Sequence, residues 1–119
     1  MSKQTLAKES LPDFAAQALV KLGKNIRTAR VRRGITGAEL AERAFINRMT
    51  VMRLENGHPG VSLGVLAHVL WVLELEDNLA MIADPQNDRL GTVLSVEKLP
   101  RHVGKKKKKT RAQELLDGI

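Results

Sequence analysis

The sequence predicts an all-α fold, and two observations support this prediction. Apolar spacing in the first half of the chain is helical, as in the stripe formed by Leu22, Ile26, Ala29 and Arg33. No window shows the period-two alternation that is typical of a half-buried β-strand. With 119 residues, the chain has the size of one compact domain with tails.

The first predicted helix begins near Leu11. Ser10 can serve as its N-cap, and a proline is tolerated in the first turn. Gly23 is a weak point, so the segment is either one helix that runs to Arg33 or two helices that are divided there. In both cases Gly34 ends it.

Two short helices follow, over residues 37–43 and 48–55. Thr36 can cap the first and Asn47 the second, because each side-chain oxygen can accept a hydrogen bond from an amide at a helix start. Only residues 44–46 lie between them. The spacing therefore predicts two helices that pack on each other across a tight turn.

Two further helices are predicted after the turn-forming residues 56–60. Ser62 can cap a helix that runs to about Leu75, and Asp77 can cap a short one that Pro85 ends. The prediction is therefore five helices, or six if the first is divided.

The C-terminal region differs in character. Residues 91–96 are rich in β-branched side chains but short, so a strand and a non-strand conformation are equally open, and a strand would need a partner chain. The lysines at 105–109 repel one another, and we expect a flexible basic tail there. Residues 111–116 suffice for one or two marginal helical turns.

Positive charge is segregated along the chain. The net charge is +7, and residues 21–57 hold nine Lys and Arg against three Glu. Residues 98–119 hold eight Lys and Arg against two acids, whereas residues 58–97 hold one Arg against six acids. Two basic blocks around an acidic one indicate a polyanionic partner, although such blocks can also be solvated surface.

Composition excludes several other classes of protein. The absence of cysteine excludes disulfides, thiolate metal sites and a cysteine nucleophile. The longest apolar stretch, residues 61–75, falls short of the roughly 20 residues of a transmembrane helix. The N-terminus lacks the apolar run of a signal peptide. We expect a cytoplasmic protein with no membrane partner.

No catalytic or metal-binding pattern is evident in the sequence. The three histidines lie far apart, and no HExxH, GxSxG or glycine-rich phosphate loop occurs. The aromatic residues do not interleave with the basic runs, which disfavours stacking on single-stranded RNA. We expect neither enzyme activity nor a cofactor.

Residues 34–57, GITGAELAERAFINRMTVMRLENG, have the layout of a helix-turn-helix motif. The run from Leu22 to Leu75 resembles the XRE, or lambda-repressor-like (Cro/CI), family of DNA-binding proteins. The matching positions are Ile26, Arg30, Gly34, Thr36, the LAERA of 40–44, Ile46, the RLENG of 53–57 and the SLGVLAHVL of 62–70. We therefore expect an N-terminal helical extension over 1–20, a five-helix DNA-binding domain over 21–84 and a C-terminal strand and basic tail over 85–119.

The resemblance implies that the helix over residues 48–55 lies in the major groove of DNA. Its arginines carry the planar fork that pairs with guanine, and Met49 and Thr50 can meet a thymine methyl group. Phosphate contact or solvation stays open for the arginines, and helix packing for the two methionines. The expected base contacts are Arg48, Met49, Thr50, Met52 and Arg53.

Contacts to the DNA backbone are expected at helix starts and in the tail. For the tail lysines, an acidic partner or a solvated state is the alternative. The expected backbone contacts are Thr36, Gly37, Asn47, Ser62, Lys105, Lys106, Lys107, Lys108 and Lys109.

Arg30 and Glu55 match positions that form a structural ion pair in the family. Two other positions depart from the family pattern. Glutamine commonly stands where this chain has Gly37, so one contact to the DNA backbone is missing. Phe45 stands at a turn position that glycine usually occupies because φ is positive there. Either the turn differs, or Phe45 is anchored in a pocket.

The helix that begins after Ser62 is apolar on both faces, which indicates that both are covered. We therefore expect one face to pack on the helix-turn-helix and the other on a second subunit. A two-fold dimer of this kind would place two reading helices one DNA turn apart. The alternative is that other helices of the same chain cover the second face. The expected dimer contacts are Val65, Val69, Trp71 and Val72.

Two functions are consistent with these expectations. One is a free-standing transcriptional repressor. The other is the antitoxin of a toxin-antitoxin system, because the Leu/Val-rich helix, the ADP turn at 83–85, the expected strand and the basic tail are similar to HipB-type antitoxins. That resemblance implies a toxin partner of HipA-like kinase fold.

Overall fold

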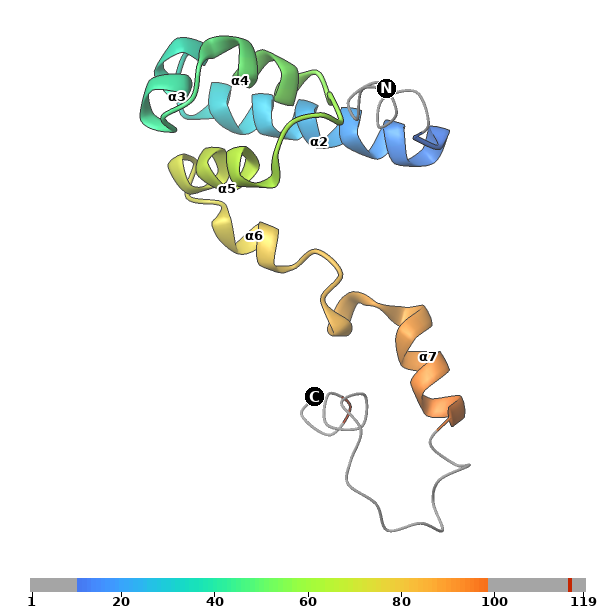
Figure 1. Ribbon diagram of the computed structural model, residues 1–119. Helices are drawn as coiled ribbons and strands as arrows, with labels where there is room; N and C mark the ends of the chain where they lie inside the picture. The colour runs from blue at the N-terminus through green and yellow to red at the C-terminus, as the bar shows by residue number, and fades with distance from the viewer. Residues whose placement is uncertain (1–10, 99–115, 117–119) are drawn as a thin grey trace. The chain divides into compact units, whose positions relative to one another are not determined.

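The computed structural model describes residues 11–98 and Leu116. All regular elements within residues 11–98 are helices, which confirms the all-α prediction (Figure 1). The chain divides into two compact units, Met1–Leu79 and Ala80–Ile119. The expected lysine contacts at 105–109 lie outside the described residues.

Helix α2 is a single helix that spans Asp13–Arg32. It begins two residues later than expected, and its N-cap position, Pro12, makes no side-chain capping bond; Ser10 lies outside the described residues. Gly23 does not divide α2. It is buried, and its lack of a side chain lets the backbone at Glu55 approach closely.

Helices α3 (Gly37–Arg43) and α4 (Arg48–Glu55) have the bounds that the sequence predicted. Thr36 and Glu39 form a reciprocal capping box with two 3.0 Å hydrogen bonds, and the backbone amide of Thr50 donates to Asn47 Oδ1 at 2.8 Å. The hydrogen bond from Thr36 holds the pKa of the exposed Glu39 carboxyl below its ordinary value. These caps satisfy amides that have no partner within the helix.

Helix α5 (Leu63–Val72) begins at the expected cap, where the amide of Val65 donates to Ser62 Oγ at 3.1 Å. It ends before Leu75, because Glu74 adopts φ 60°. The amides of Glu74 and Leu75 then close the helix end on the carbonyls of Trp71 and Leu70. Helix α6 (Glu76–Ala80) ends five residues before Pro85, which instead starts a 3₁₀ turn, η1 (Pro85–Asn87).

Residues 91–96 do not form a strand; they belong to helix α7 (Arg89–Lys98). Asp88 supplies the local reason, because its Oδ1 accepts a hydrogen bond from the amide of Gly91 at 2.9 Å. The hydroxyl of Thr92 also donates to the carbonyl of Asp88 at 3.0 Å. A helix pairs its own backbone groups, whereas a lone strand would leave them without partners.

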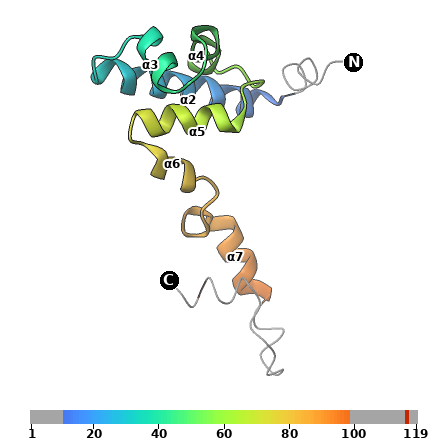
Figure 2. The same cartoon turned by 60° about the vertical axis from the view of Figure 1, so that its left-hand side comes forward.

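The core of the first unit lies among α2, α3, α4 and α5. Helix α4 packs on α2 and α3, and α3 also contacts α5. In Figures 1 and 2, α5 runs beside α2, on the side away from α4. The buried residues are Ile26, Ile35, Leu40, Ala41, Ala44, Val51, Leu54, Leu66, Val69, Leu70 and Leu73.

Val69 is not available for the expected dimer contact, because its side chain is 0% exposed in this core. It faces the core together with Leu66 and Leu70 of α5 and with Leu73, which follows the helix. Val65 and Val72 are partly buried against the same core. Of the four residues expected at an interface, only Trp71 is largely exposed, at 59%. The second apolar face is therefore smaller than the sequence pattern suggested.

Replacement of Gly23 by alanine should destabilise the fold, because the added methyl group would overlap the backbone at Glu55. We expect the free energy of unfolding in urea to fall by about 1–3 kcal/mol, as for other overpacked sites. Gly37→Ala is the matched control, since a Cβ there meets nothing within 4 Å. Equal stabilities of the two variants would contradict the close approach of α2 and α4.

Candidate nucleic-acid interface

Helix α4 presents a sharply divided surface. Val51 and Leu54 are buried against the core, while Arg48, Met49 and Arg53 on the other side are exposed. Met52 is also exposed, so neither methionine packs between helices as the alternative interpretation required. Four of the five side chains expected to contact bases therefore reach the surface.

Thr50 differs from the other expected base contacts. It is half-buried, and its hydroxyl donates to Asn47 Oδ1 at 3.0 Å. Together with the bond from the Thr50 amide, this engages the Asn47 oxygen twice. The structure thus places Thr50 in the cap of α4.

The start of α3 lies beside the start of α4. Thr36 and Gly37 line a hollow of 370 Å³ together with Arg48 and Met52. Arg48 and Met52 also line a second hollow, of 420 Å³, whose other lining residues come from α2 and the end of α4. Ser62, Met49 and Arg53 line neither hollow. Of the expected contacts, the structure therefore brings Thr36 and Gly37 together with Arg48 and Met52, whereas Asn47 and Thr50 also line neither hollow.

Arg30 and Glu55 form the expected ion pair. Arg30 Nε and Nη2 donate to the two carboxylate oxygens of Glu55 at 2.7 and 3.0 Å. The side chains are only 13% and 10% exposed. Arg30 Nη1 also donates to the carbonyl oxygen of Ile35 at 2.9 Å. The hydrogen bond with Glu55 raises the pKa of the Arg30 guanidinium above its ordinary value. One side chain thereby connects α2, α4 and the loop before α3.

Phe45 adopts φ 59°, so the turn between α3 and α4 has the left-handed conformation that glycine usually supplies. The residue is 81% exposed, which excludes the anchoring pocket considered above. The amide of Ile46 donates to the carbonyl of Ala41 at 3.0 Å, as in a Schellman end. The turn geometry is therefore retained at the expense of local strain.

Three polar residues of the second hollow were not singled out from the sequence. Lys24 and Arg27 on α2, and Asn56 after α4, line it together with Arg48. The spacing of Lys24, Arg27 and Arg30 on one helix was the available signal, because residues three apart share a helix face.

Within the described ranges, no group of three or more His, Asp or Glu side chains could hold a metal ion. None of the helices in that part of the chain has the length and apolar character needed to cross a membrane.

Removal of one partner of the Arg30–Glu55 pair should destabilise the protein, because the other charge would stay largely buried without a partner. We expect Glu55→Gln and Arg30→Leu each to lower the free energy of unfolding by about 2–4 kcal/mol. A double-mutant cycle should give a coupling energy of about 1–3 kcal/mol. Arg32→Ala, on the exposed surface of the same helix, should change stability by less than about 0.5 kcal/mol. Additive single effects would show that the pair is not coupled.

Comparison of the chain with protein-family models, curated proteins and solved structures finds no match.

Proposed function

We propose that the protein is a sequence-specific, double-stranded DNA-binding repressor that inserts α4 into the major groove. The observation that carries this proposal is the outward surface of α4, where Arg48, Met49, Met52 and Arg53 are exposed. The opposite side of the helix is held by the core and by the Arg30–Glu55 pair. A short, fixed helix with an exposed cationic face suits a groove that is about 12 Å wide.

The roles of the residues follow from their chemistry. Arg48 and Arg53 would each donate two hydrogen bonds to guanine O6 and N7, and the methionines would contact thymine methyl groups. Thr36, Gly37, Asn47 and Ser62 lie at helix starts, where backbone amides favour a phosphate. The sequence also assigns phosphate contacts to Lys105–Lys109, and this stays a prediction.

A homodimer is part of the proposal, because two reading helices on a two-fold axis recognise a palindromic site. Its support in the structure is confined to exposed apolar residues on α5, namely Trp71 and Leu63. Val69 has no part in the interface.

The toxin partner expected from the antitoxin resemblance stays a prediction, as does the alternative of a free-standing regulator. The expected C-terminal strand was one feature of that resemblance, and residues 91–96 are helical instead. Co-purification with the product of a neighbouring kinase-like gene would separate the two alternatives.

Arg48→Ala should lose sequence discrimination. A binding site is first selected from a random duplex library with the full chain. On the selected site, the variant should bind about 5- to 160-fold more weakly, which corresponds to the 1–3 kcal/mol of one bidentate base contact. On a scrambled duplex the loss should be much smaller.

Arg43→Ala is the control for this experiment, because it removes an exposed arginine from α3 that lines neither hollow. Equal losses of Arg48→Ala on both duplexes would assign Arg48 to a phosphate. Failure of the wild-type chain to enrich any sequence would overturn the proposed function.

Trp71→Asp should convert the proposed dimer to monomers, because a carboxylate would have to be desolvated at an apolar contact. Sedimentation velocity gives the readout, with Thr28→Asp, an exposed position on α2, as the control. A wild-type chain that sediments as a monomer would contradict the dimer, and a Trp71→Asp variant that stays dimeric would place the interface elsewhere.

A further inference from the structure

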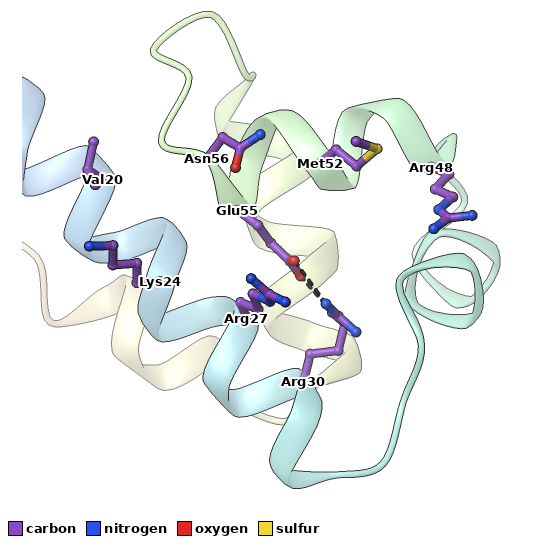
Figure 3. Close-up of a pocket in the computed structure, with 8 residues that line it drawn as sticks. All are labelled: Val20, Lys24, Arg27, Arg30, Arg48, Met52, Glu55 and Asn56. Atoms are coloured by element: carbon purple, nitrogen blue, oxygen red, sulfur yellow. Dashed lines mark hydrogen bonds and ion pairs between the residues drawn. The ribbon is translucent and has the colours of Figure 1, made fainter.

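The 420 Å³ hollow between α2 and α4 gathers cationic side chains from two helices. Figure 3 shows Lys24, Arg27 and Arg30 along α2, with Arg48 on α4. Asn56, just after α4, adds an amide to the lining, and Val20 and Met52 supply apolar wall. We call this hollow the α2–α4 cleft.

Charge in the α2–α4 cleft is unbalanced. Among residues 11–98, Glu55 is the only acidic residue that lines it, and both oxygens of that carboxylate accept hydrogen bonds from Arg30. Within residues 11–98, neither Lys24, Arg27 nor Arg48 forms a salt bridge with a carboxylate. Three cations therefore line one concave surface, and no carboxylate among residues 11–98 pairs with them, which favours an anionic ligand there.

The position of the α2–α4 cleft beside the proposed base-reading surface favours a DNA phosphate as the anion. Arg48 and Met52 belong both to the cleft and to the proposed base-reading surface. When α4 lies in a major groove, the sugar-phosphate backbone that borders the groove runs alongside the helix. We infer that the α2–α4 cleft binds backbone phosphates of the same duplex, with Lys24 and Arg27 as the phosphate contacts. This inference rests on the proposed function and adds α2 to the DNA-contacting elements.

The cations of α2 are held in a fixed position relative to α4. Gly23 and Gly57 let the two backbones meet, since a Cβ on Gly57 would lie 2.6 Å from the Cα of Val20. The Arg30–Glu55 pair adds a polar contact between the same elements. A phosphate site built on such a contact sets the register of the helix on DNA without reading sequence.

The test measures binding of the full chain to a 30-base-pair duplex over a series of KCl concentrations, for the selected site and for a scrambled sequence. The double variant Lys24→Ala/Arg27→Ala should lower the slope of log affinity against log salt by about 0.9 per lost contact. At 0.1 M salt, each lost contact weakens binding about eightfold on both duplexes alike.

The matched control is Lys21→Ala/Arg32→Ala, which removes the same charge from exposed positions of α2 outside the cleft. Its slope should stay close to that of the wild type. The charge-retaining variant Lys24→Arg/Arg27→Lys should keep the wild-type slope, which separates loss of a phosphate contact from a folding defect. Thermal unfolding of each variant checks the fold.

Equal slopes for the cleft variant and its control would overturn the inference. The proposed function would survive that result if Arg48→Ala still loses discrimination. A cleft variant that loses affinity on the selected site alone would also overturn the inference, because phosphate contacts do not depend on sequence. Absence of duplex binding by the wild-type chain would overturn both.

Discussion

The Arg30–Glu55 pair is the constraint on which the candidate interface depends. The last residue of α4 is tied to the last third of α2, so the direction of α4 is set by a charged, doubly hydrogen-bonded contact. Apolar packing of Val51 and Leu54 determines which side of α4 faces inward. The ion pair therefore sets the direction of the α4 axis, and the buried apolar residues set the rotation of α4 about that axis. Together they leave the cationic side chains of α4 facing outward.

Helices α2 to α5 all end in the same way, with the same backbone conformation and hydrogen bonds. Each closes with a residue at positive φ and two backbone hydrogen bonds back into the last turn. Gly34 and Gly57 occupy this position without strain, whereas Phe45 and Glu74 occupy it against the ordinary preference of their side chains. Backbone hydrogen bonds thus fix these connections even where the residue at positive φ is not glycine.

Local chemistry made part of the fold predictable and left the rest undetermined. The starts of helices α3 and α4 were predicted to the residue because their caps, Thr36 and Asn47, act on amides three positions away. Val69 was assigned to the wrong face because a helix that is apolar all round does not encode which side meets the core. The β-branched run at 91–96 left strand and non-strand open, and the structure shows a helix whose Gly91 amide donates to the Asp88 carboxylate. The α2–α4 cleft was missed because its cations come from helices whose alignment only tertiary packing decides.

Gly37 leaves open space on the candidate interface, because it has no side chain and a Cβ there would meet nothing within 4 Å. A side chain added there would project into open space at the mouth of the hollow that it shares with Arg48, with no neighbour to displace. A substitution at Gly37 can therefore change the chemistry of the proposed DNA-contacting surface without repacking the core.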